Sequence, residues 1–273
     1  MTAITSNDMA TAAPAATSTS TGTAKRTGTP TVSIKQYSRR GIFAIWAAAA
    51  VPMGVLAWIV APAIADGNDI ASLVKPLLAC LTAGLVWQFL LVVGLVGYEQ
   101  RTLRWSRLRE ALWLRSPRSP RTGRVGGRLW LLVIPITIGL GIEELVSLPA
   151  PLNRNFGEFL SSDAGEAMFH GSWGWFALTV TMFLFNTVLG EELLFRGVLL
   201  PRMNGAFGDR DWVANGLLHA TYHLHMPWVI PASLVDMFLV AYPAKRYRSA
   251  LLGMAVHSAQ SVMFTVLILT LVV

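Results

Sequence analysis

The stretch Gly190-Glu191-Glu192-Leu193-Leu194-Phe195-Arg196 places two adjacent carboxylates and a guanidinium inside an otherwise apolar run from Trp173 to Leu200. A run of this length and composition predicts a helix that crosses a membrane. On insertion scales, each charge near the middle of such a helix costs roughly 2.5–3.5 kcal/mol. We therefore expect these charges to pair with one another or to face a polar cavity, as intramembrane charges at functional sites do.

The composition of the whole chain agrees with a membrane protein. Of its 273 residues, 53% are hydrophobic and 14% are charged, whereas about 25% of the residues of a soluble domain are charged. The mean hydropathy is +0.51. The single cysteine, Cys80, permits no intrachain disulfide and no cysteine-based metal site. We predict an all-α fold, a polytopic transmembrane helical bundle with a disordered N-terminal tail.

Seven apolar runs are candidate spans. Residues 1–40 precede them and are rich in Thr, Ser, Ala, Pro and Gly, a composition that predicts a disordered cytoplasmic tail. We divide the remainder into 41–128, two spans plus a basic loop, and 129–273, a core that holds the unusual polar residues. The expected spans are 41–65, 76–97, 129–148, 173–200, a short run that begins near 211, 226–244 and 250–273.

A basic loop sets the expected orientation. Residues 101–128 contain nine arginines against one glutamate, Glu110, and such loops stay in the cytoplasm by the positive-inside rule. As far as Arg115 the arginines alternate with Leu and Trp, a pattern typical of an amphipathic helix on anionic lipid. Arg202 is expected in a cytoplasmic turn. We therefore expect a multi-pass protein of the cell membrane with a cytoplasmic N-terminus and no nucleic-acid partner.

The charged residues of the opening stretch differ in their helical faces. Glu192 and Arg196 are four residues apart, so they share a face in the better order for an ion pair. Glu191 is rotated by about 100° from Glu192 and need not share that pairing. The spacing predicts one glutamate held by the arginine and one glutamate free to act.

Histidines on two later runs recur at the same spacing. His219 and His223 are four residues apart, as are His257 and Ser261. At about 1.5 Å per residue, Glu191, His223 and His257 lie roughly 14, 18 and 10 Å from the cytoplasmic ends of their runs. Three spans could therefore bring a carboxylate and two imidazoles to one cavity.

These motifs resemble those of the CPBP intramembrane proteases, a family that includes the type II CAAX prenyl proteases and the bacterial Abi-type proteins. The pattern Glu-Glu-x-x-x-Arg is present at 191–196. The pattern Phe-x-x-x-His appears at 219–223, with His219 in the phenylalanine position. The pattern His-x-x-x-Asn appears at 257–261, with Ser261 in the last place. The resemblance covers roughly residues 130–270.

The resemblance implies an endopeptidase that hydrolyses a peptide bond of a membrane-associated protein or peptide. Glu191 would activate the water, a task suited to a carboxylate in a low-dielectric site. Glu192 and Arg196 would buttress Glu191, and His223 would help to hold the water. His257, together with Ser261 or Gln260, would stabilise the oxyanion.

The residues leave the part of a metal open. Glu191, His223 and His257 match the glutamate and two histidines of a catalytic zinc site, and the same set can orient water without a metal. We interpret His219 as a packing residue or one behind the site, and Glu143 as an interfacial residue.

Two other classes of function fit the same polar residues. One is a non-catalytic membrane protein on this scaffold, which would act by binding, for example in immunity to a bacteriocin. The other is a proton-coupled transporter, because intramembrane Glu and His also mark proton relays. Transporters commonly contain internal repeats, and none is found in the sequence, so this class ranks last.

Overall fold

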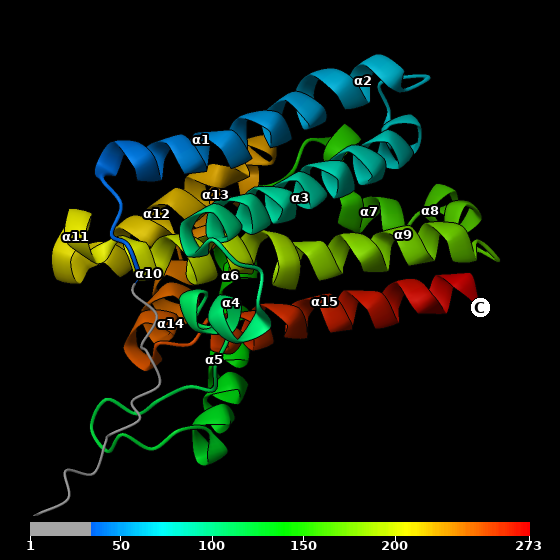
Figure 1. Ribbon diagram of the computed structural model, residues 1–273. Coiled ribbons are helices and arrows are strands. Elements are labelled where there is room, and N and C mark those ends of the chain that lie inside the picture. The colour runs from blue at the N-terminus through cyan, green and yellow to red at the C-terminus, as the bar shows by residue number, and fades with distance from the viewer. Residues whose placement is uncertain (1–33) are drawn as a thin grey trace, which may run out of the picture. The chain divides into compact units, whose positions relative to one another are not determined.

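The long apolar runs of the sequence fold as long helices. The computed structural model describes residues 34–273, and within that range four helical segments are long and apolar enough to cross a membrane: Arg39–Ile64, Ile70–Gln100, Trp173–Arg202 and Ala250–Val272. The bent pair Pro227–Ser233 and Met237–Tyr247 makes a fifth if it is counted as one span. Figure 1 shows α1, α3, α9 and α15 running along one another.

The helices have the following bounds. The α-helices are α1 (Arg39–Val55), α2 (Ala61–Ile64), α3 (Ile70–Gln100), α4 (Trp105–Ala111), α5 (Val133–Leu140), α6 (Glu143–Val146), α7 (Phe156–Leu160), α8 (Asp163–Phe169), α9 (Trp173–Leu184), α10 (Leu200–Arg202), α11 (Asn204–Phe207), α12 (Asp211–Tyr222), α13 (Ile230–Ser233), α14 (Tyr242–Tyr247) and α15 (Ala250–Val272). Four π-helical segments, at Leu56–Val60, Phe185–Gly190, Leu193–Leu199 and Met237–Ala241, continue or join them. The 3₁₀ turns are Gly127–Leu132, Leu152–Arg154, Gly208–Arg210, His223–His225 and Pro227–Val229.

Short polar side chains define where the long helices begin. Ser38, Asp69 and Ser249 precede α1, α3 and α15, and each accepts a hydrogen bond from a backbone N–H of the first turn. Such caps satisfy donors that the helix itself leaves unpaired. At the start of the described chain, Gln36 donates to the carbonyl of Pro201 at 3.0 Å. The expected tail otherwise lies outside the described residues, apart from its last seven positions.

The fourth expected span is present as one long helical segment, while three other expected spans take a different form. The run 129–148 breaks at Gly141 into the short helices α5 and α6, and glycine is costly inside a helix. The run that begins near 211 is the 12-residue α12, about 18 Å long at 1.5 Å per residue. The run 226–244 bends by 46° between α13 and Met237. Of the seven predicted spans, four are therefore present as helices long enough to cross a membrane. The bent pair makes a fifth if it is counted as one span.

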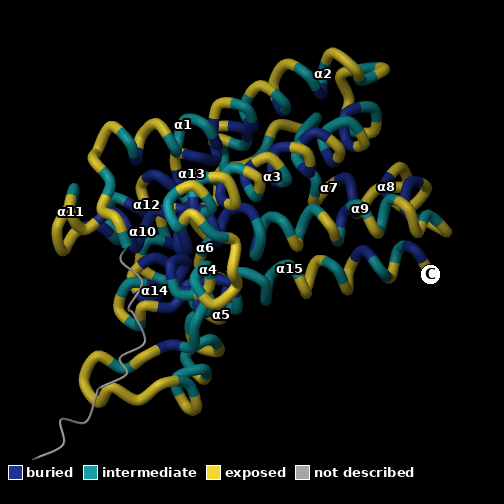
Figure 2. The backbone as a smooth tube through the Cα atoms, in the orientation of Figure 1, coloured by how far each residue is buried: buried dark blue, intermediate teal, exposed yellow. Residues whose placement is uncertain are grey.

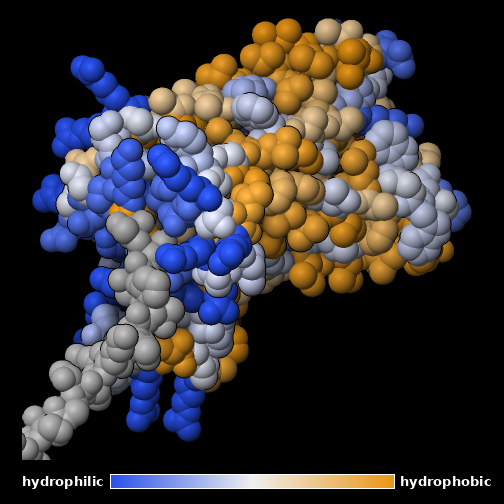
Figure 3. Space-filling view, in the orientation of Figure 1, coloured by the Kyte–Doolittle hydropathy of each residue, from blue (hydrophilic) through white to orange (hydrophobic). Residues whose placement is uncertain are grey.

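The surface of residues 34–273 separates apolar from charged side chains. Figure 3 shows hydrophobic residues over the long helices and hydrophilic residues gathered near α11. Buried residues concentrate where α10, α12 and α14 meet the long helices, as Figure 2 shows. The polar site described below lies among these buried residues.

Candidate active site

Glu191 lies in the Trp173–Arg202 segment between two π-helical stretches. Single π-helical turns inside α-helices occur frequently at functional sites. The Glu191 side chain is 3% exposed, and its Oε2 atom lies 3.4 Å from Nε2 of His219 and 3.8 Å from Nε2 of His223. Two histidines, one from α12 and one from the turn that follows it, therefore face one carboxylate oxygen of the Trp173–Arg202 segment.

The two histidines are positioned by α12 and the turn that follows it. Trp46 of α1 donates to the carbonyl of Leu218 at 2.8 Å, and Gln88 of α3 donates to the hydroxyl of Tyr222. These bonds hold the end of α12 against two long helices. His223 then turns back over α12, and its Nδ1 donates to the carbonyl of His219 at 3.1 Å.

Glu192 belongs to a separate group. Its Oε1 lies 3.3 Å from a terminal nitrogen of Arg196 and 3.4 Å from Nδ1 of His257 on α15. Glycine at position 253 permits this approach, because a Cβ there would lie 2.5 Å from Oε2 of Glu192. The adjacent glutamates thus face different partners: Glu191 faces His219 and His223, and Glu192 faces Arg196 and His257.

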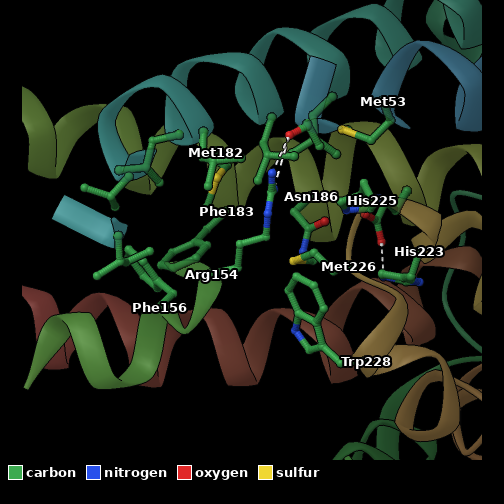
Figure 4. A pocket seen from close by; sticks show the side chains of 18 residues that line it. Met53, Arg154, Phe156, Met182, Phe183, Asn186, His223, His225, Met226 and Trp228 are labelled. Atoms are coloured by element: carbon green, nitrogen blue, oxygen red, sulfur yellow. Dashed lines mark hydrogen bonds and ion pairs between the residues drawn. The ribbon is translucent and has the colours of Figure 1, made fainter. Parts of the chain in front are cut away.

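A cavity of about 250 Å³ opens beside Glu191 and His223. Its walls are mainly apolar side chains of the first two long helices and of Trp173–Arg202, joined by Met226 and Trp228. Figure 4 shows His223 on one side of this cavity and Arg154 extending into it from another. The cavity gives an apolar ligand a route to the buried carboxylate.

One comparison with known proteins bears on this site. Residues 172–263 match the family model described as type II CAAX prenyl endopeptidase Rce1-like. This segment of the chain is Rce1-like. The match spans about a third of the chain, and it confirms the family resemblance inferred from the sequence. No curated protein and no solved structure matches the chain.

The Rce1-like segment contains both glutamate groups, and the match supports a CAAX-type intramembrane protease in general terms. A buried carboxylate beside imidazoles, at the wall of an apolar cavity, can hold and deprotonate a water molecule. The geometry of Glu191 and His223 is of this kind.

Ser261 and Gln260 are not joined to either glutamate by a hydrogen bond in the part of the chain that the structure describes. Gln260 instead donates to Oε2 of Glu143 at 3.3 Å. Glu143, expected at an interface, is thus tied to the polar interior. Ser261 lies one turn beyond His257 on α15 and is half-buried. The carbonyl of Ser261 accepts from the Thr265 hydroxyl at 2.7 Å.

The set of possible metal ligands differs from the predicted one. Glu191, His219 and His223 each offer a ligand atom, and these atoms all lie within 4.8 Å of one another. His257 was expected in this set, but its Nδ1 lies 3.4 Å from Oε1 of Glu192. His219, which was interpreted as a packing residue, takes the place of His257. Its ring is fully buried and lies edge-on to Phe195.

Asp236 is a site residue that the sequence analysis missed. Its Oδ2 lies 3.5 Å from Nδ1 of His219, and the residue is 9% exposed in the bend between α13 and Met237. A lone carboxylate in the expected span 226–244 was the available signal, because charges inside spans are rare without a function.

Arg154, at the cavity, is the second residue that the sequence did not single out. Both of its terminal nitrogens lie 3.2 Å from the carbonyl oxygen of Ala57, and its guanidinium lies 4.0 Å from the ring centre of Trp58. The local helix explains the free carbonyl: the N–H of Ala61 bonds to Leu56 in the π-helical turn, and the next residue, Pro62, has no N–H. Among the side chains that the structure describes, no carboxylate is in ion-pair contact with Arg154.

Proposed function

We propose that this protein is an intramembrane endopeptidase in which Glu191 activates the water that attacks a peptide bond. One observation carries the proposal. Oε2 of Glu191 is buried, has no hydrogen-bond partner among residues 34–273, and faces His223 at the wall of an apolar cavity. An unpartnered buried acceptor costs about 1–3 kcal/mol, so a protein that keeps one has a use for it.

The neighbouring residues support defined roles. His223 holds the water with Glu191, and Nε2 of His219 lies 3.4 Å from the same oxygen. Glu192 and Arg196 fix the helix behind Glu191, while His257, held at 3.4 Å by Glu192, is the donor for the oxyanion. Preorganised donors of this kind stabilise the charge that develops in the transition state.

The cavity supports a particular kind of substrate. Its apolar walls fit an apolar stretch of a membrane-associated protein or peptide. Arg154 adds a guanidinium without a carboxylate partner, which suits a carboxylate on the substrate because the guanidinium fork pairs with carboxylates in two parallel hydrogen bonds. We place the protein in the cell membrane, with its N-terminus and the arginine-rich loop 101–128 in the cytoplasm.

The experiment that tests this function compares the termini of membrane proteins in cells that express the wild type or Glu191→Gln. Glu166→Gln, an exposed acidic residue of α8, is the matched control. We expect new termini in wild-type and Glu166→Gln cells that are absent with Glu191→Gln at equal protein levels. Identical termini in all three would contradict proteolysis and favour a protein that acts by binding.

A further inference from the structure

A second cavity, of about 620 Å³, lies where α4 packs against α3 (Figure 1). Its walls are mainly apolar side chains from three of the long helical segments, among them Val92, Leu189 and Met254. Trp105 of α4 also lines the cavity and is 65% exposed. Within the described chain, this cavity has no lining residue in common with the one beside Glu191. Its volume lies within the range of about 300–1,000 Å³ that is usual for ligand sites.

Two arginines line the same cavity, beside its apolar walls. They are Arg109, which is exposed on the last turn of α4, and Arg115, which is half-buried. Among residues 34–273, neither arginine is in ion-pair contact with a carboxylate. The guanidinium fork pairs with phosphate oxygens in two parallel hydrogen bonds. The combination of free guanidiniums and apolar walls therefore suits an anion that carries an apolar chain.

The backbone holds Arg115 against the turn between α14 and α15. Its Nε donates to the carbonyl of Arg248 at 3.0 Å, and its own carbonyl accepts from the Ser249 hydroxyl at 2.6 Å. The N–H of Arg118 donates to the carbonyl of Tyr247 at 2.9 Å. These bonds join two basic segments that are distant in sequence, and they gather three arginines at one edge of the cavity.

The gathered arginines create an excess of positive charge. Burial lowers the pKa of Arg115, and the positive charge of Arg248 lowers it further. Glu110 offsets part of this effect, while Arg118 adds to it. Positive charges this close repel one another, and a bound anion would relieve the repulsion.

The position of the cavity favours a lipid over other anions. The loop 101–128 carries nine arginines against one glutamate, which places it at the cytoplasmic surface, where the leaflet contains anionic lipids. Basic pockets between membrane-spanning helices on that side bind anionic headgroups. A free phosphate would leave the apolar walls uncovered, whereas the acyl chain of a lipid would cover them.

We propose that this cavity binds one anionic phospholipid, with its phosphate on Arg109 and Arg115 and an acyl chain against Val92 and Leu189. A defined site for one molecule differs from the general attraction of a basic loop to an anionic surface, because it depends on the residues that line the cavity. Lipid binding does not depend on the proposed protease activity, so either proposal can fail without the other.

The test uses the full-length protein purified in detergent, with phosphatidylglycerol and phosphatidylcholine of the same acyl chains as probes. Native mass spectrometry measures the bound lipid, and thermal unfolding is followed as each probe is added. We expect one phosphatidylglycerol molecule to bind about tenfold more tightly than phosphatidylcholine. The unfolding temperature should rise with phosphatidylglycerol and stay unchanged with inorganic phosphate.

Substitutions locate the site. Arg109→Gln and Arg115→Gln should each weaken phosphatidylglycerol binding about fivefold. Val93→Trp, at an exposed position of the cavity wall, fills the cavity and should weaken binding about tenfold. The matched control is Arg121→Gln, an exposed arginine of the same loop outside the cavity lining, which should bind the lipid as the wild type does.

Several results would overturn the proposal. Equal affinity for the two lipids, or equal stabilisation by inorganic phosphate and phosphatidylglycerol, would contradict an anionic lipid. Equal weakening in Arg109→Gln and Arg121→Gln would show only a general attraction to the basic loop. Wild-type binding in Val93→Trp would show that no acyl chain lies in the cavity. Should Arg115→Gln fail to accumulate, the pair Arg109→Gln and Arg121→Gln carries the comparison, because both residues are exposed.

Discussion

Two clusters of buried charge lie on the Trp173–Arg202 segment, and they differ in how far their polar atoms are satisfied. At the end of the segment, Arg202 donates from Nε and a terminal nitrogen to the two carboxylate oxygens of Glu99 at 2.8 and 3.2 Å. Its other terminal nitrogen donates to three backbone carbonyls. Burial raises the pKa of Tyr37 to about 12, so its hydroxyl keeps its proton at neutral pH and donates to Glu99 at 2.9 Å.

The Glu191 cluster, about three turns earlier on the segment, is the opposite case. In the described part of the chain, several buried atoms here have no hydrogen-bond partner: Glu191 Oε2, Glu192 Oε2, the three nitrogens of Arg196 and both ring nitrogens of His219. A satisfied network around Arg202 stabilises the fold, whereas unsatisfied atoms around Glu191 cost stability and leave bonding capacity for water, substrate or a cation. The degree to which buried polar atoms are hydrogen-bonded therefore distinguishes charges that stabilise the fold from charges that are available for function.

The largest effect is expected where the two roles separate most clearly. Glu191→Gln keeps the shape of the side chain and removes the base, so cleavage should fall by about 10²–10⁴-fold. Thermal unfolding in detergent should remain at the wild-type temperature or rise, because a buried charge has been removed. Cleavage measured per folded molecule checks the first part, and full activity in this variant would remove Glu191 from the mechanism.

Arg202→Met should show the reverse pattern. Removing one partner strands the Glu99 carboxylate and costs about 3–5 kcal/mol of unfolding free energy, while cleavage per folded molecule should stay close to that of the wild type. Denaturant unfolding and accumulation in the membrane measure the loss. Arg104→Met, an exposed arginine just before α4, is the control and should change stability by less than about 0.5 kcal/mol. A stable Arg202→Met protein would refute the structural role.

The effects of Arg196→Met on stability and cleavage should lie between those of Glu191→Gln and Arg202→Met. Glu192 loses the guanidinium but keeps His257 at 3.4 Å, so about 1–3 kcal/mol of stability should be lost, less than for Arg202→Met. Cleavage should fall as well, because Glu192 and His257 lie beside Glu191. Unfolding and cleavage are measured on the same preparation, and a variant with unchanged values for both would show that the Glu192–Arg196 contact serves neither purpose.

Local signals explain what the sequence could predict. The run 173–200 is long and apolar, so a single helical segment follows from composition alone, and the spacing of Glu192 and Arg196 predicted a contact that the structure contains. Gly141 was a local signal for the break in 129–148, because glycine is costly inside a helix, whereas no such signal announced the bend before Met237. Arg202, expected in a cytoplasmic turn, is fully buried, and its partner lies 103 positions away.

The grouping of the histidines depended on helix rotation. Each π-helical turn adds a residue and rotates the following side chains by about 100° relative to a regular helix, and such segments lie on both sides of Glu191. The estimated depth of each residue along its span therefore placed Glu191, His223 and His257 at similar levels in the membrane. It could not show toward which neighbouring helix each side chain points. The structure directs Glu191 to His219 and Glu192 to His257.

The smallest effect is expected at Arg154, which in the present structure resembles neither cluster fully. Its guanidinium caps the Ala57 carbonyl, yet it extends into the cavity beside Glu191 and has no carboxylate partner among the described side chains (Figure 4). Arg154→Leu should raise KM about tenfold, or about 1.4 kcal/mol, for a peptide that carries a free carboxylate. Arg154→Leu should leave kcat and the KM of the same peptide with an amide in that place unchanged. An equal loss of activity toward both peptides would show that Arg154 supports the π-helical turn at Ala57. Arg154 would then have a structural role, as Arg202 does.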